Sequence, residues 1–128
     1  MADIDHDLLA RKAEALVKRL QEATRWQETP EVGKTQASKA IEVAQSAPTP
    51  SLFINWLRYQ TARESADRRF WSYSLEPQQT LAEALAADLR DIVKDLSPEQ
   101  RMRAVTLYLG YFRRALVGMK YLDRIPLL

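Results

Sequence analysis

The sequence contains no cysteine, a single histidine and only 3 glycines in 128 residues. Without cysteine, disulfides, thiolate metal sites and cysteine nucleophiles are all excluded. Three scattered glycines form no glycine-rich phosphate loop, and one histidine near the amino terminus supplies neither a metal centre nor a base for a serine nucleophile. We therefore expect a protein that is not an enzyme, with no catalytic residue, no metal and no cofactor.

Long apolar runs are also absent, so no segment is predicted to cross a membrane. The first residues are acidic where a secretory signal peptide carries positive charge. Together with the lack of cysteine, these features predict a soluble cytoplasmic protein without a membrane partner. The length is that of one domain that buries its own core.

Alanine, leucine, arginine, glutamate and glutamine are abundant, and all of them favour helices. Apolar residues recur every three or four positions in five segments, which is the period of amphipathic helices. The sequence therefore predicts an all-α fold, a compact bundle of about five helices in a single domain 1–128. The predicted helices are Ile4–Gln27, Lys34–Ser46, Ser51–Ser74, Thr80–Leu96 and Pro98–Leu122, with an amino-terminal segment 1–31, a core bundle 32–122 and a tail 123–128.

Two local features mark the last predicted helix. Ser97-Pro98-Glu99-Gln100 resembles a capping box, so the helix is predicted to begin at Pro98. Gly110 lies within this helix, where glycine is about 1 kcal/mol less favourable than alanine. We therefore expect close helix packing to require Gly110.

Positive charge is unevenly distributed, although the net charge is only +2. Residues 32–75 hold six basic and three acidic residues, and residues 98–128 hold six basic and two acidic residues. Residues 76–97, between them, hold two basic and five acidic residues. Two basic segments make a polyanion a candidate partner for whatever face they share.

The stretch Ser51–Ser74 combines core material with charge. It contains two of the three tryptophans, Trp56 and Trp71, beside four arginines. Read as one helix, the stretch buries Trp56 and Phe70 against the bundle and turns its arginines outward. These arginines are Arg58, Arg63, Arg68 and Arg69.

Arg58, Ser65 and Arg69 lie seven and then four residues apart, which places them on one side of such a helix. The simplest alternative is that these arginines only form the solvent-exposed side of the helix, where Glu64 and Asp67 partly neutralise them. We favour a functional face because the last predicted helix carries a second basic strip. At 100° per residue the members of this strip lie within about 120° of one another; they are Arg103, Thr106, Gly110, Arg113, Arg114, Val117 and Lys120.

Arginine contacts phosphate oxygens bidentately and needs no base readout to do so. Tyr108, Tyr111, Phe112 and Tyr121 are read more simply as core or interface residues than as platforms for stacked bases. A helix-turn-helix DNA binder is disfavoured, because no short pair of helices joined by a glycine turn is present. The leading alternative is a helical adaptor whose basic strips pair with acidic strips on copies of itself or on a partner protein.

Phe53–Glu64 contains an aromatic and aliphatic run followed by a Tyr-x-x-Ala-Arg element at Tyr59–Arg63, and Tyr111–Tyr121 begins with Tyr-Phe and ends with Lys-Tyr. These segments resemble the central and closing helices of the small helical subunit of type III CRISPR effector complexes of the Csm kind. The order and lengths of the helices agree over roughly residues 32–122. The chain departs from the family in Ala62, where glycine is frequent, and in its long first helix that starts acidic.

The resemblance implies a non-catalytic role. Several copies would stack head to tail along a filament of backbone subunits, in a complex with a large subunit, and line the groove that holds guide RNA paired with target RNA. Positive side chains would contact phosphates without reading sequence, because base pairing supplies specificity. Carried over to this chain, the RNA-binding residues would be Lys39, Arg58, Arg63, Arg68, Arg69, Arg103, Arg113, Arg114 and Lys120.

Overall fold

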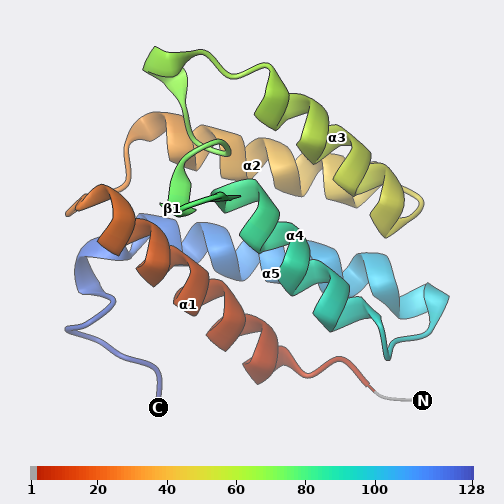
Figure 1. Cartoon of the computed structure of the whole chain (residues 1–128). Coiled ribbons are helices and arrows are strands. Elements are labelled where there is room, and N and C mark those ends of the chain that lie inside the picture. The colour runs from red at the N-terminus through yellow and green to blue at the C-terminus, as the bar shows by residue number, and fades with distance from the viewer. Residues whose placement is uncertain (1–2) are drawn as a thin grey trace.

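The computed structural model describes residues 3–128, whose helices pack against one another as a bundle (Figure 1). Within these residues the chain has five α-helices, two 3-10 turns and one two-stranded antiparallel hairpin. The predicted all-α bundle of about five helices is therefore confirmed. The elements are α1 (His6–Thr24), α2 (Glu31–Ser46), α3 (Pro50–Ala62), η1 (Ala66–Arg68), β1 (Ser74–Glu76), β2 (Gln79–Thr80), α4 (Leu81–Val93), α5 (Pro98–Val117) and η2 (Met119–Tyr121).

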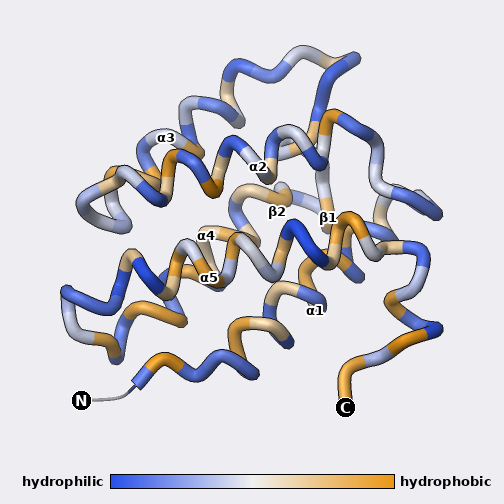
Figure 2. The backbone as a smooth tube through the Cα atoms, turned by 180° about the vertical axis from the view of Figure 1, so that it is seen from behind, coloured by the Kyte–Doolittle hydropathy of each residue, from blue (hydrophilic) through white to orange (hydrophobic). Residues whose placement is uncertain are grey.

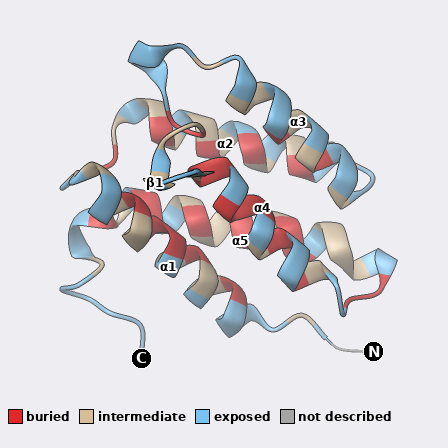
Figure 3. Ribbon diagram, in the orientation of Figure 1, coloured by how far each residue is buried: buried red, intermediate tan, exposed pale blue. Residues whose placement is uncertain are grey.

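α5 is the central helix of the bundle. α1 and α2 make the most extensive contacts with it, and α4 and α3 lie in front of it in the view of Figure 1. Buried residues gather where the helices face one another (Figure 3), and on α5 they are Ala104, Val105, Tyr108, Leu109, Phe112, Ala115 and Leu116. Hydrophobic residues of the other four helices converge on this core. No helix in the described part of the chain is both long and apolar enough to cross a membrane.

The carboxyl-terminal tail, residues 123–128, is largely hydrophobic (Figure 2) and is held against α1. Lys18 of α1 forms an ion pair with Asp123, and Arg11 donates a hydrogen bond to the backbone carbonyl of Leu128. The side chain of Ile125 remains exposed. Polar contacts at both of its ends therefore position the tail.

The helix predicted over Ser51–Ser74 is wrong in its second half, because α3 ends at Ala62. After one 3-10 turn the chain passes into the core, where Phe70 and Trp71 are completely buried, each 0% exposed. Trp56, on α3, is half-buried and packs against the core. Both aromatic side chains predicted to face inward do so, but they reach the core from different elements.

The Glu64 carboxylate is responsible for this change of direction. It accepts hydrogen bonds from the backbone N–H groups of Phe70, Trp71 and Ser72 at 3.0, 2.9 and 2.9 Å, and from the Ser72 hydroxyl at 2.7 Å. A side chain that satisfies backbone donors outside a helix competes with continuation of that helix. Glu64 therefore closes a loop where the predicted helix had about three more turns.

The start of α5 lies where the sequence placed it, but the predicted capping box is wrong. Ser97 is the N-cap and Pro98 the first helical residue, whereas the Ser97 hydroxyl donates to the side-chain oxygen of Gln100 (3.4 Å) and makes no backbone contact. A capping box forms at α4 instead. There the Thr80 hydroxyl accepts from the Glu83 N–H at 3.2 Å, and the Glu83 carboxylate accepts from the Thr80 N–H at 2.9 Å.

Two glycines have opposite surroundings. A Cβ atom at Gly33 would lie 2.9 Å from both Phe70 Cε1 and Thr29 Cγ2, so the absence of a side chain lets the Phe70 ring pack on α2. A Cβ atom at Gly110 would meet nothing within 4 Å. The expected close packing at Gly110 is therefore wrong, and this glycine leaves open space on the outer side of α5. α5, predicted to reach Leu122, ends earlier, at Val117, and the turn η2 follows it.

Alanine at these two positions is expected to change stability in opposite directions. Gly33→Ala should lower the free energy of unfolding by about 1–3 kcal/mol, because the fully buried Phe70 ring has no room to move away. Gly110→Ala should raise it by about 0.5–1 kcal/mol through helix propensity alone. Urea unfolding followed by circular dichroism measures both values. A Gly33→Ala variant as stable as the parent would contradict the packing of Phe70 on α2.

Asp88 is a half-buried carboxylate between α4 and α5. The hydroxyl of the fully buried Tyr108 donates a 2.6 Å hydrogen bond to it. Burial raises the pKa of Asp88, and the hydrogen bond from Tyr108 and positive charge on α1 offset part of this effect. Asp91, by contrast, is exposed, and its contacts with Lys12 and Lys94 lower its pKa to about 2. The contributions of these two carboxylates to the stability of the fold should therefore change with pH in opposite directions.

Amide substitutions should reveal these opposite signs. Asp88 contributes most to stability when protonated, below its unfolded pKa of 3.8, and this contribution is lost as the pH rises through its raised pKa. The stability of Asp88→Asn relative to the parent should therefore increase with pH. Asp91 contributes stability above pH 3.8 that is lost as the pH falls through about 2. Asp91→Asn should therefore lose stability relative to the parent as the pH rises.

Thermal unfolding of the parent and both variants, from about pH 2 to about pH 8, measures these differences. Each variant serves as the control for the other, because both remove one carboxylate from the same helix. A constant difference between Asp88→Asn and the parent across this range would show that Asp88 is not desolvated in the folded state.

Candidate nucleic-acid interface

Acidic and histidine side chains form no ligand cluster in residues 3–128: no group of three or more His, Cys, Asp or Glu is placed to hold a metal ion there. The Nδ1 atom of His6 lies 3.2 Å from the Tyr111 hydroxyl, where α1 begins beside α5. The candidate site is therefore described through its basic side chains.

These basic side chains fall into two classes. Six of the 19 form ion pairs with carboxylates, namely Arg11, Lys12, Lys18, Arg19, Lys34 and Lys94. None of the nine predicted RNA-binding residues forms an ion pair with any residue that the structure describes. Eight of the nine are exposed, and Arg113 is half-buried. An anion that binds these nine side chains therefore displaces no ion pair.

One group of these residues lies along α5 and the neighbouring α2. We call it the α5 strip and define it as Arg103, Gly110, Arg113 and Arg114 of α5 with Lys39 of α2. The Nε of Arg113 donates a 2.6 Å hydrogen bond to the hydroxyl of Ser38, the residue before Lys39, and this bond connects α5 to α2. The Arg114 guanidinium lies over the Tyr111 ring at 5.6 Å. Arg103 borders a shallow hollow of about 350 Å³ between α2 and α5.

A second group, the arginine loop, consists of Arg63, Arg68 and Arg69 after the end of α3. The guanidinium of Arg63 lies 5.3 Å from the centre of the Tyr59 ring, and that of Arg69 lies 5.7 Å from the centre of the Tyr73 ring. The carboxylate of Glu64 is occupied by backbone donors. Asp67 accepts a 2.9 Å hydrogen bond from the Ser65 hydroxyl, and this bond lowers the pKa of Asp67.

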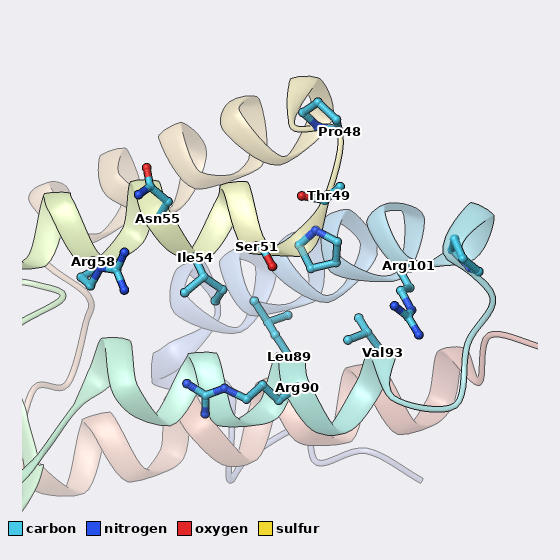
Figure 4. A pocket seen from close by; sticks show the side chains of 12 residues that line it. Pro48, Thr49, Ser51, Ile54, Asn55, Arg58, Leu89, Arg90, Val93 and Arg101 are labelled. Atoms are coloured by element: carbon cyan, nitrogen blue, oxygen red, sulfur yellow. The ribbon is translucent and has the colours of Figure 1, made fainter.

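Arg58 belongs to neither group. Figure 4 shows that it lies in a groove between α3 and α4, beside Arg90 of α4 and with Arg101 of α5 at the far end. The Nε of Arg101 donates a 3.1 Å hydrogen bond to the Leu96 carbonyl, which fixes its guanidinium at that end of the groove. Arg58 is therefore separated from the arginine loop by the end of its own helix.

The basic residues of α3 and α5 do not form the single wall that the sequence suggested. Arg101 and Arg103 are two residues apart, which is about 200° around a helix, so they point to opposite sides of α5. Arg101 lines the groove with α3 and α4, whereas Arg103 lines the hollow beside α2. Lys120 lies apart from both in η2, with its Nζ 5.8 Å from the centre of the Tyr121 ring.

Sequence reasoning missed Arg90 and Arg101 as members of a site. Arg90 lies in residues 76–97, where acidic residues outnumber basic ones, and Arg101 lies outside the basic strip predicted on the last helix. The signal that could have indicated them is the run of alanines in α4, because Ala82, Ala86 and Ala87 line the groove with Arg90. Small side chains on a helix face leave room beside it.

Comparison with protein families, curated proteins and solved structures finds no match to this chain. The similarity to the small subunit of type III CRISPR complexes therefore stands on the two segments that carry it, Phe53–Glu64 and Tyr111–Tyr121. In the structure the first of these segments comprises most of α3 and the start of the arginine loop. The second comprises the carboxyl-terminal part of α5 and η2.

Replacement of Glu64 should loosen the arginine loop. Glu64→Gln is expected to lower the free energy of unfolding by about 2 kcal/mol, because a neutral amide makes weaker hydrogen bonds to backbone donors than a carboxylate does. The amide protons of Phe70, Trp71 and Ser72 should exchange with solvent faster. Asp67→Asn removes the same charge from the same loop but from an exposed side chain that holds none of these backbone donors, and it should change stability much less than Glu64→Gln does. Equal effects of the two substitutions would contradict the proposed role of Glu64.

Proposed function

We propose that this protein is a non-catalytic small subunit of a type III CRISPR ribonucleoprotein effector and that it contacts RNA through phosphates. The observation that carries the proposal is that nine exposed or half-buried basic residues have no carboxylate partner in the described chain, while six other basic residues do. Unpaired surface arginines on a protein of low net charge favour a polyanionic partner. In this role the partners are guide and target RNA, the backbone and large subunits, and further copies of the chain.

The chemistry of these residues favours phosphate contacts over base readout. Arginine binds phosphate oxygens in a bidentate manner. The exposed or half-buried aromatic rings near them, Tyr59, Tyr73 and Tyr111, each have a guanidinium over one face. Rings covered in this way are poor platforms for stacked bases. Binding should therefore be independent of sequence, with specificity left to the pairing of guide and target.

The α5 strip is the best candidate for the primary RNA contact. Gly110 lies at its centre, and the open space above this residue lets a phosphate approach the helix backbone closely. Arg103 and Arg114 flank Gly110, and Arg113 is already ordered by its bond to Ser38. An ordered side chain loses less conformational entropy on binding. The arginine loop and Lys120 are separate positive groups that would make secondary contacts.

A helical adaptor without a nucleic-acid role is the second candidate, and one observation favours it. A hollow of about 330 Å³ between the start of α1 and the end of α4 has the exposed Leu8 at its edge. Its charged lining residues are Asp3, Asp5 and Asp95 and the ion pair of Asp91 with Lys94. This acidic hollow is a complementary surface for a basic partner, including another copy of the chain. The two functions differ in whether RNA is bound at all.

RNA binding and its salt dependence should distinguish these functions. Affinity for single-stranded and duplex RNA, measured by fluorescence anisotropy, should fall steeply with salt for the parent chain. The triple variant Lys39→Ala, Arg103→Ala, Arg114→Ala should bind more weakly, with a slope on single-stranded RNA that is shallower by about 2 on the logarithmic plot, because each lost phosphate contact accounts for about 0.7.

The matched control is Arg11→Ala, Lys34→Ala, Lys94→Ala, which removes the same charge from side chains that are already paired. It should retain most of the RNA affinity and slope. Equal losses in both triple variants would mean that net charge, and not the α5 strip, determines binding. A parent chain that binds no RNA but self-associates in a sedimentation experiment would establish the adaptor function instead.

A further inference from the structure

The groove between α3 and α4 is continuous along both helices. Two adjoining hollows of about 760 and 600 Å³ share Ile54, Arg58 and Arg90 as lining residues. On the α3 side the lining extends from Pro50 to Ala62, the whole length of that helix. We call this feature the α3–α4 groove. Its length is about 18 Å at 1.5 Å per residue, which matches a helical segment of about 12 residues.

The charge of the α3–α4 groove is positive and has no internal counter-ion. Arg58, Arg90 and Arg101 line it, and none of them forms an ion pair within residues 3–128. The one acidic residue in the lining is Glu83. Its carboxylate accepts hydrogen bonds from the backbone N–H and the hydroxyl of Thr80, both at 2.9 Å, and is committed to the helix cap. The groove therefore favours carboxylates or other anions from outside.

The floor of the α3–α4 groove is aliphatic. In Figure 4 the side chains of Ile54, Leu89 and Val93 lie between Arg58 and Arg90 at one end and Arg101 at the other. No aromatic side chain lines either hollow. Nucleobases stack on aromatic or guanidinium planes, whereas an aliphatic floor suits leucine, isoleucine and valine side chains. Ala82, Ala86 and Ala87 line the α4 wall and allow another helix to approach closely.

From these features we infer that the α3–α4 groove binds an acidic amphipathic helix of a partner protein. The aliphatic stripe of that helix packs on Ile54, Leu89 and Val93. Its carboxylates pair with Arg58 and Arg90 at one end and with Arg101 at the other. This function goes beyond RNA binding, because it uses a surface on the other side of α5 from Arg103 and a lining suited to protein side chains.

The hydrophobic tail of the chain is not the occupant within the same molecule. Asp123 is paired with Lys18, and the Leu128 carbonyl accepts from Arg11, so both ends of the tail are tied to α1. The groove lies between α3 and α4, and none of its lining residues comes from α1 or from the tail. The surface is therefore available to a separate protein.

The test uses a fluorescein-labelled peptide of about 14 residues that repeats leucine at helical i, i+3, i+4 and i+7 positions and carries glutamate elsewhere. The full chain should bind this acidic peptide with an affinity that falls with salt. A peptide with lysine in place of every glutamate should not bind. Arg90→Glu with Arg101→Glu should weaken binding of the acidic peptide by about tenfold or more, because two attractive pairs become repulsive.

Two controls separate this inference from the proposed RNA function. The variant Lys39→Ala, Arg103→Ala, Arg114→Ala should keep its peptide affinity, and Arg90→Glu, Arg101→Glu, which changes none of the nine proposed RNA-binding residues, should keep its RNA affinity through the α5 strip. In the groove variant Arg90 is exposed and Arg101 half-buried, and circular dichroism and thermal unfolding confirm that it is folded. A groove variant that loses RNA binding as strongly as peptide binding would overturn the inference and assign the groove to nucleic acid.

Two further results would also overturn it. If the acidic peptide does not bind at low salt, or binds equally well to the groove variant, the α3–α4 groove is not a site for an acidic helix. If the chain self-associates in sedimentation experiments and the groove variant does not, the occupant is a second copy and not a different protein.

Discussion

The Glu64 carboxylate is the single group on which the arrangement of the central segment depends. It accepts hydrogen bonds from three backbone N–H groups and one hydroxyl. The chain can therefore leave α3 and enter the core without leaving these donors unpaired. Trp71 can then lie parallel to Phe112 of α5, with ring centres 6.2 Å apart, and donate its indole N–H to the Gln36 side chain at 3.1 Å. The core of the bundle and the position of the arginine loop are thus set by the same contact.

This arrangement divides the positive charge among different surfaces. Because α5 lies at the centre of the bundle, the surface that it forms with α2 is separated from the surface that it forms with α3 and α4. A strip suited to phosphates, with open space over Gly110, and a groove with an aliphatic floor therefore coexist on one small protein. Their chemistries differ although both use arginine, because the neighbouring side chains decide which anion fits.

The helical period in the sequence was enough to predict an all-α bundle and the inward direction of Phe70, and the Ser97-Pro98 pair was enough to predict the start of α5. The period could not reveal the end of α3, because that depends on hydrogen bonds that the Glu64 carboxylate accepts from residues six to eight positions later, which no periodic pattern records. The nine predicted RNA-binding residues were correctly placed near the surface, but their grouping was not predictable. It depends on which helices lie beside each face of α5, and Arg90 and Arg101 became part of a site only through such tertiary neighbours.

α3 connects the α3–α4 groove to the arginine loop, so a movement of this helix would affect both surfaces. Its middle, at Arg58, forms one wall of the α3–α4 groove, and its carboxyl-terminal end passes directly into the arginine loop. Glu64 clamps that loop to the buried Phe70–Trp71 segment, so the carboxyl-terminal end of the helix is anchored to the core. A tilt of α3 that changed the width of the groove would therefore also move Arg63, the residue that caps the carboxyl-terminal end of the helix.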